Sequence, residues 1–152
     1  MSPRPSARCV RRELRVVVDT NVWVSALVNP DGSPGQVIRA ARAGRMEVVA
    51  SWDLAEELIG VLARRKLRRY HFSPEDEQEV LTWLGRSLPS VELNVQLRDP
   101  DDAVVVAAAV AGRADAIVTG DRSLLDDAEL RAWLDALGIA VLAPAELLER
   151  LA

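Results

Sequence analysis

The sequence predicts a three-layer α/β/α fold in which helices cover a central parallel sheet of about five strands. Short β-branched or apolar runs alternate along the chain with longer segments of helical periodicity, which is the pattern of successive βαβ units. The chain has 152 residues, of which 49% are hydrophobic and 28% are charged, so it is long enough for one domain with a buried core. No repeat or low-complexity tract divides it.

The expected strands are short and apolar. The first, residues 15–18, is a β-branched run of the kind that lies buried on both faces of a parallel sheet. Four further strands are expected at residues 46–50, 91–94, 116–119 and 139–142. Because polar residues or turns follow these runs, each strand is expected to end where the chain passes into a helix or a loop.

Helical segments fill the intervals between the strands. Asp19, Thr20 and Asn21 favour a helix start before residues 22–28, and the turn at residues 29–32 ends that helix. Pro34 then lies at the first position of the next helix, where its missing N–H costs nothing. The remaining helices are expected at residues 33–43, 54–62, 73–88, 103–112, 130–137 and 144–151.

Composition excludes several classes of protein. The 19 Lys and Arg against 23 Asp and Glu give a formal charge of −4, which excludes a histone-like polycation but permits a local basic patch. The single cysteine, Cys9, excludes an intramolecular disulfide framework and fits a cytoplasmic location. No apolar run approaches about 18 residues, so no membrane span is expected. Residues 1–14 are expected to form a flexible Arg-rich tail before a single domain at residues 15–152, with the true start of the protein left open.

Acidic residues follow the expected strands at the end where parallel sheets hold their functional sites. Asp19 follows the first strand, Asp121 follows the strand at residues 116–119, and Asp102 begins the apolar helix between them. If these two strands are neighbours, the three carboxylates converge on one crevice. Each also has a structural explanation, since Asp19 and Asp102 could cap helices and Asp121 could be a turn residue. Acids after two different strands nevertheless favour a site.

A fourth acid comes from the helix that follows the second strand. Glu57 borders the apolar stripe formed by Leu54 and Leu58, whereas Glu56 is turned further out and one of the two is expected to be solvated. Four carboxylates in one crevice oppose one another's ionisation, and a divalent cation relieves that conflict. Mg²⁺ and Mn²⁺ prefer oxygen ligands, so such a site predicts phosphoryl transfer or phosphodiester cleavage.

Other catalytic motifs are missing from the sequence. No G-x-x-x-x-G-K-[ST] loop is present and no G-x-G-x-x-G follows a strand, which argues against nucleotide-cradling loops. The lone His71 argues against zinc and Ser-His-Asp chemistry. Receiver domains, whose acidic pocket relies on a lysine at a late strand end, are disfavoured because the chain's one lysine, Lys66, lies in mid-chain.

Residues 16–22 (VVVDTNV) resemble the opening of a PIN domain, the nuclease fold of many bacterial toxin–antitoxin systems. Residues 98–102, which precede the Ala-rich helix, and residues 114–121 and 143–148 match later motifs of that family in the same order. The resemblance covers about residues 15–151 and is closest to a branch of toxin components in VapBC-like systems. It implies a PIN-like (Rossmann-like) fold with the first strand central in the sheet.

The resemblance also implies the site. The catalytic and metal-binding carboxylates would be Asp19, Glu57, Asp102 and Asp121, with Glu56, Asp101 and Asp99 as alternative positions. Asn21 and Thr119 match polar positions that orient the acids or their waters. Mg²⁺ or Mn²⁺ is the implied cofactor and RNA the implied substrate, so the expected activity is that of a metal-dependent endoribonuclease. Whether one or two metals bind is left open.

Partners follow from the same resemblance. PIN toxins are silenced by a small antitoxin protein that covers the crevice, often with an Arg or Lys, and they commonly form homodimers. We therefore expect a toxin of a type II toxin–antitoxin system with a cognate antitoxin. A DNA-directed or housekeeping PIN nuclease and a catalytically inactive PIN-like binding module are the alternatives.

A basic run and four tryptophans are the remaining candidates for contact with RNA. The run supplies the cations Arg64, Arg65, Lys66, Arg68 and Arg69, which fit phosphate contacts and fit a solvated helix end equally well. The tryptophans Trp23, Trp52, Trp83 and Trp133 could stack on bases, although aromatic residues at helical spacing more often belong to the core or to a dimer interface.

Overall fold

A computed structural model describes residues 13–63 and 102–152 of the chain. Within these ranges, four strands form one parallel sheet in the order β2-β1-β3-β4. The strands are β1 (Leu14–Val18), β2 (Met46–Val48), β3 (Ala116–Val118) and β4 (Ala140–Leu142). They correspond to four of the five expected strands, and the strand expected at residues 91–94 and the helix expected at residues 73–88 lie outside the described residues. Of the tail expected at residues 1–14, residues 1–12 also lie outside them, and Leu14 is the first residue of β1.

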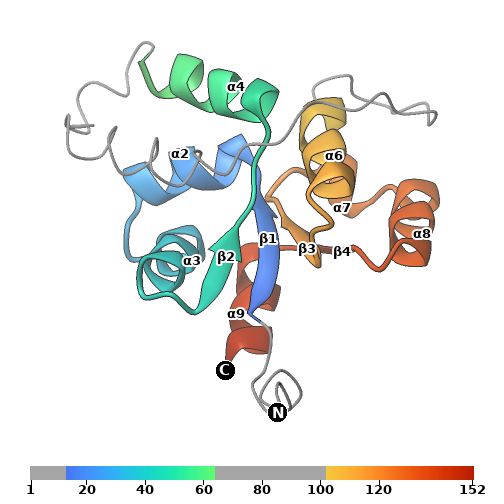
Figure 1. Cartoon of the computed structure of the whole chain (residues 1–152). Coiled ribbons are helices and arrows are strands. Elements are labelled where there is room, and N and C mark those ends of the chain that lie inside the picture. The colour runs from blue at the N-terminus through green and yellow to red at the C-terminus, as the bar shows by residue number, and fades with distance from the viewer. Residues whose placement is uncertain (1–12, 64–101) are drawn as a thin grey trace, which may run out of the picture.

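Helices flank the sheet, so the α/β architecture is confirmed. Figure 1 shows α2, α3 and α4 gathered on the side of β2, and α7 and α8 on the side of β4. The helices are α2 (Thr20–Val28), α3 (Ser33–Arg42), α4 (Trp52–Ala63), α6 (Asp102–Ala111), α7 (Arg122–Leu125), α8 (Ala128–Ala136) and α9 (Pro144–Leu151). None of the helices in the described ranges is long and apolar enough to cross a membrane.

Strand β1 lies in the interior of the sheet, as the resemblance implied. It pairs with β2 on one edge and with β3 on the other, and Val16, Val17 and Val18 are at most 1% exposed. In the β1–β3 ladder Val18 is level with Val118, so the two strands end together. The residues that follow them, Asp19 and Thr119, therefore lie close together at the carboxyl edge of the sheet.

Two differences between the expected and the observed helices have a local physical cause. Helix α2 starts at Thr20 rather than at residue 22 because Asp19 itself takes the N-cap position with an extended backbone. Helix α7, a single turn, was not expected at all. It forms because the Asp121 side chain accepts a hydrogen bond from the backbone N–H of Ser123, which satisfies one of the free N–H groups of the first turn.

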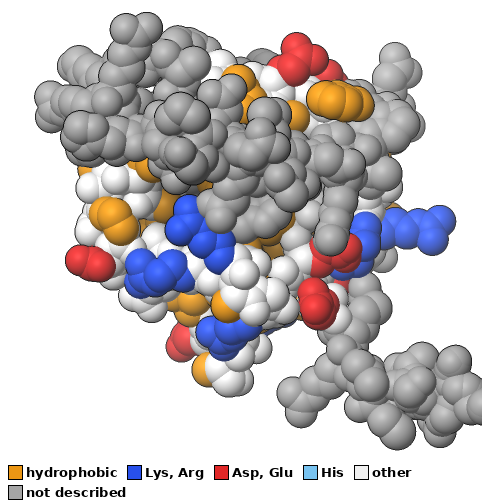
Figure 2. All heavy atoms as spheres, turned by 60° about the vertical axis from the view of Figure 1, so that its left-hand side comes forward, with side chains coloured by type: hydrophobic (Ala, Val, Ile, Leu, Met, Phe, Trp, Pro, Cys, Tyr) orange, Lys and Arg blue, Asp and Glu red, His pale blue; other side chains and the backbone are white. Residues whose placement is uncertain are grey.

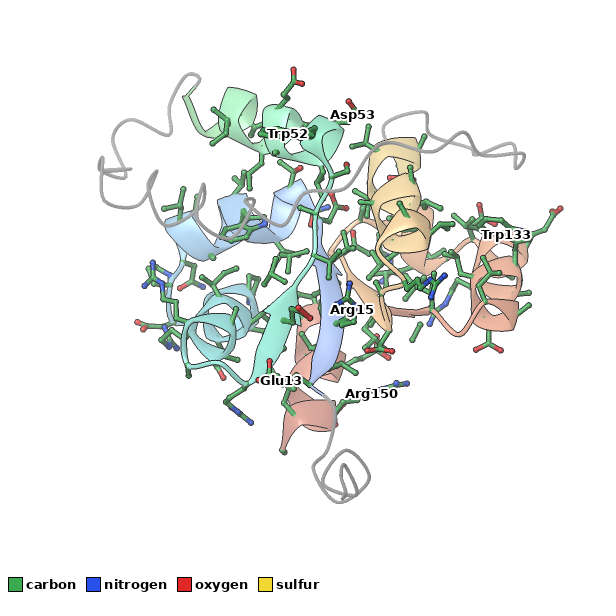
Figure 3. All side chains as sticks on the ribbon, in the orientation of Figure 1. Glu13, Arg15, Trp52, Asp53, Trp133 and Arg150 are labelled. Atoms are coloured by element: carbon green, nitrogen blue, oxygen red, sulfur yellow. The ribbon has the colours of Figure 1, made fainter. Side chains whose placement is uncertain are left out.

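A side-chain network closes the opposite, amino end of the sheet. The guanidinium of Arg15 donates to Glu47 Oε1 over 2.8 Å and to the carbonyl oxygen of Gly112 over 2.7 Å, and the Arg15 N–H donates to Asp115 Oδ2 over 2.8 Å. Arg15 is labelled in Figure 3. These bonds tie β1 to β2 and to the chain between α6 and β3.

Candidate active site

Asp19 is a buried carboxylate at the end of β1. It occupies the N-cap position of α2, yet its side chain makes no capping hydrogen bond, and it is only 7% exposed. Its Oδ2 instead accepts hydrogen bonds from the Thr119 hydroxyl over 2.7 Å and from the Asn21 side-chain amide over 3.2 Å. Helix capping therefore does not explain why an aspartate is buried here.

Asn21 and Thr119 join the ends of β1 and β3. Besides its bond to Asp19, the Asn21 side chain accepts a hydrogen bond from the Gly120 N–H over 3.0 Å. The Thr119 hydroxyl, in turn, accepts the Asp121 N–H over 2.9 Å. The structure thus places both residues around Asp19, in positions where they fix the orientation of its carboxylate.

Asp102 and Asp121 come from different helices and share one partner. Asp102 is the first residue of α6 and is 5% exposed, and its Oδ2 accepts a hydrogen bond from the Ser123 hydroxyl over 2.7 Å. Asp121 is half-buried at the N-cap of α7, and its Oδ1 accepts the Ser123 N–H over 2.9 Å. The structural explanation considered for Asp121 was a turn residue, and its Oδ1 instead caps the single turn of α7. The alternatives Asp99 and Asp101 lie outside the described residues.

Glu57 projects from α4 toward the start of α2. Its Oε2 accepts a hydrogen bond from the Thr20 hydroxyl over 2.6 Å, and its side chain is half-buried. Glu56 is exposed, in the direction expected from the apolar stripe. The Ser51 hydroxyl accepts a hydrogen bond from the Leu54 N–H over 3.1 Å and so caps α4, which begins at Trp52 shortly after the end of β2.

The charges of these acids affect one another. Burial raises the pKa of Asp19 above its ordinary value, and the negative charges of Glu57 and Asp121 raise it further, while hydrogen bonds from Thr119 and from the Thr20 N–H act in the opposite direction. Carboxylates from β1, α4 and the end of β3 are therefore close enough to interact. A cation placed among them would be favoured on electrostatic grounds.

The chemistry of the donors fits Mg²⁺ or Mn²⁺, since every candidate ligand is a carboxylate oxygen. Within residues 13–63 and 102–152, however, no three Asp, Glu, His or Cys side chains converge as a ready-made metal site. Each of the four acids is bonded instead to a hydroxyl or an N–H group. Mg²⁺ commonly binds through one or two carboxylates and keeps several waters, so this spacing accommodates a hydrated ion.

Two residues of the site escaped the sequence analysis, namely Thr20 and Ser123, whose hydroxyls hold Glu57 and Asp102. The available signal was adjacency, because Thr20 follows Asp19 directly and Ser123 lies two residues after Asp121. Adjacency alone does not say which acid a hydroxyl reaches. In both cases the partner is far away in the chain.

The candidates for RNA contact are distributed unevenly. Trp23 is 8% exposed and belongs to the core, and Trp133 is half-buried and packs against it, as expected for most tryptophans. Trp52, by contrast, is 63% exposed at the start of α4, where Figure 3 labels it beside Asp53. Trp83 and the basic run with Arg64, Arg65, Lys66, Arg68 and Arg69 lie outside the described residues.

The described residues form an α/β fold in which the interior strand of a parallel sheet is followed by a buried aspartate. PIN domains belong to this class of fold. The PIN domain family model matches residues 15–123, and the chain belongs to this family, whose members are generally nucleases. The chain is also 31% identical over 117 residues to the uncharacterized protein MJ1680 of Methanocaldococcus jannaschii, a match that covers 74% of each chain.

Among solved structures, the fold is similar to a chain in the crystal structure of VapBC2 from Rickettsia felis bound to a DNA fragment from their promoter. That match has a TM-score of 0.49 and 14% sequence identity, and it covers 86% of this chain and 98% of that chain. The family assignment rests on the family model and on the archaeal relative.

Replacing Asp19 with Asn should change the thermal stability of the metal-free protein. Without metal at neutral pH, Asp19→Asn should unfold at a higher temperature than wild type because a buried charge beside other negative charges is removed. A rise of about 2–4 °C would correspond to about 1 kcal/mol for a chain of this size. Calorimetry in the presence of a chelator measures the difference, and Asp31→Asn, at an exposed turn, is the control that should leave it unchanged.

The same comparison has a defined pH dependence. The pKa of Asp19 is higher in the folded than in the unfolded chain, so its ionisation favours unfolding. This unfavourable contribution is absent below the ordinary carboxyl pKa, grows as the pH rises from that value to the raised pKa of the folded protein, and is constant above it. The stabilisation by Asp19→Asn should therefore shrink on acidification. A difference in unfolding temperature that is negative, or that does not change with pH, would contradict the assigned environment of Asp19.

Proposed function

We propose that this protein is a metal-dependent endoribonuclease that hydrolyses RNA phosphodiester bonds and serves as the toxin of a type II toxin–antitoxin system. The observation that carries the proposal is Asp19, a carboxylate that is buried without capping its helix and that lies beside other acids. Membership of the PIN domain family supports the nuclease activity. The net charge of −4 and the acidic strand ends support a cationic antitoxin.

The chain's own residues would divide the work. Asp19, Asp102 and Asp121 would hold Mg²⁺ or Mn²⁺, which when bound neutralises the phosphate and lowers the pKa of a coordinated water. Thr119 and Asn21 keep the Asp19 carboxylate in one orientation. Glu57, held by the Thr20 hydroxyl through one oxygen, supplies a second oxygen that can accept a proton from the attacking water.

RNA cleavage by the purified protein tests the activity directly. We expect cleavage with Mg²⁺ or Mn²⁺ and none with EDTA, and we expect Asp19→Asn and Glu57→Gln to lower the rate by at least about 100-fold, as for the loss of a group that acts in the transition state. The exposed neighbour variant Glu56→Gln is the matched control and should cleave like wild type.

The other interpretations give different results in the same assay. Cleavage of DNA but not of RNA would favour the DNA-directed nuclease. Binding of nucleic acid without cleavage under any metal would favour an inactive PIN-like module. Wild-type rates in a folded Asp19→Asn protein would remove Asp19 from the site.

Contacts with RNA would involve the basic run and one tryptophan. The face shown in Figure 2 carries Arg side chains as well as Asp and Glu side chains, whereas residues 64–69 of the sequence hold five cations in six positions. The cations Arg64, Arg65, Lys66, Arg68 and Arg69 are therefore the proposed phosphate contacts. Trp52 is the one described tryptophan whose ring is exposed enough for a base to stack on it.

Trp52→Ala should weaken binding of a single-stranded RNA oligonucleotide at least about fivefold, the loss expected when a stacking contact of about 1 kcal/mol is removed. Trp52→Phe should retain most of the affinity because the ring is kept. Leu137→Ala removes a comparably exposed apolar residue (52% against 63%) between α8 and β4 and should have no effect. Fluorescence anisotropy in EDTA measures binding without cleavage. Equal affinities for Trp52→Ala and wild type would exclude stacking on Trp52.

The antitoxin would cover the acidic strand ends. A cationic side chain entering this site would take the place of the metal, so antitoxin affinity should fall as the Mg²⁺ or Mn²⁺ concentration rises.

We also propose that the protein forms a homodimer. Trp133, one of the tryptophans considered for a dimer interface, is half-buried against the core and so offers only part of its apolar surface to a second copy.

Expression of the chain alone should slow the growth of a bacterial host, and Asp102→Asn should restore it because the cleavage that harms the cell is lost. Glu56→Gln, expressed to the same soluble level, should remain as toxic as wild type. Growth curves with immunoblots of the soluble fraction provide the measurement. Normal growth with abundant soluble wild type would overturn the toxin assignment and leave the nuclease assignment intact.

A further inference from the structure

Ser123 forms hydrogen bonds to two acids that belong to different helices. Its hydroxyl donates to Asp102 Oδ2 over 2.7 Å, and its backbone N–H donates to Asp121 Oδ1 over 2.9 Å. Asp102 begins α6 and Asp121 caps α7, so a single residue connects the N-terminal ends of both helices.

The two bonds constrain the two carboxylates together. Asp102 is 5% exposed, and a buried carboxylate needs hydrogen-bond donors to remain ionised at an acceptable cost. Because the Ser123 N–H is fixed by the capping turn of α7, its hydroxyl reaches Asp102 from a fixed position. The remaining oxygen of each acid then has a defined direction instead of rotating freely about its χ angles.

We propose that Ser123 is a positioning residue, which holds Asp102 and Asp121 at the separation that a hydrated divalent cation requires. The proposal rests on the proposed metal-dependent function. Ser123 acts through the two acids and needs no contact with RNA. Its hydroxyl donates a hydrogen bond to Asp102. The hydroxyls of Thr20 and Thr119 do the same for Glu57 and Asp19, respectively. Removing it should cost metal affinity first and cleavage as a consequence.

The test is Mn²⁺ affinity of the purified full-length chain, measured by electron paramagnetic resonance of free Mn²⁺ and by calorimetry. Ser123→Ala should weaken binding by about 10- to 100-fold, the range seen when a group that orients a metal ligand is removed. Ser123→Thr keeps a hydroxyl on the same carbon and should restore affinity to within a few-fold. Ser25→Ala, on the exposed side of α2, is the matched control and should bind Mn²⁺ like wild type.

A second background distinguishes positioning from a general loss of structure. In Asp102→Asn protein the acid that Ser123 orients is already lost, so adding Ser123→Ala should weaken Mn²⁺ binding much less than it does in wild type. In Glu57→Gln protein the Ser123→Ala effect should remain at full size. Ser123→Cys, which nearly preserves the volume but donates hydrogen bonds weakly, should behave like Ser123→Ala and covers the case in which alanine impairs folding.

The outcomes are distinct. Unchanged Mn²⁺ affinity in folded Ser123→Ala and Ser123→Cys, or no rescue by Ser123→Thr, would overturn the role of Ser123 while wild type still binds and cleaves. An equal loss in the wild-type and Asp102→Asn backgrounds would also overturn it, because Ser123 would then act elsewhere. A wild-type protein that binds no Mn²⁺ would overturn the proposed function itself, and this inference with it.

Discussion

The hydrogen bond between the Thr119 hydroxyl and Asp19 is the interaction on which the rest of the site depends. It joins the carboxyl ends of β1 and β3, and the same hydroxyl accepts the Asp121 N–H, so the orientation of Asp19 and the path of the chain into α7 are fixed together. This is possible because the two strands pair in a register that ends them at the same level. The pairing of β1 with β3 thus places Thr119 next to Asp19, and the Thr119 hydroxyl fixes the position of the buried carboxylate.

Strand and helix positions could be predicted from the sequence because they depend on local patterns. The β-branched run before Asp19 and the all-apolar helix after Asp102 identify buried elements without knowledge of their neighbours. The orientation of Glu57 against Glu56 was likewise readable from the phase of the apolar stripe, and the structure has Glu56 exposed. The pairing of β1 with β3 depends on contacts between residues far apart in the chain. The sequence could therefore give it only as an assumption, and the central position of β1 only as an implication of the PIN resemblance.

The hydroxyl partners could not be predicted because they depend on that tertiary arrangement. Ser123 has two acids within a few residues, yet its hydroxyl bonds to Asp102, which lies 21 residues earlier in the chain. The Thr20 hydroxyl bonds to Glu57, 37 residues later, rather than to the adjacent Asp19. Short polar side chains have many local hydrogen-bond options, and only the packing of α4 and α6 at the strand ends selects among them.

The chain order of the site has a consequence for protein synthesis. Asp19 leaves the ribosome early, but its partner Thr119 is 100 residues further along, and Asp121 follows that. A nascent chain can pair β1 with β2 long before β3 exists, yet during that time the carboxylate of Asp19 has no hydroxyl to hold it. The candidate site is therefore complete only late in translation, and a truncated product that ends before β3 carries three of the four acids but neither Thr119 nor Ser123.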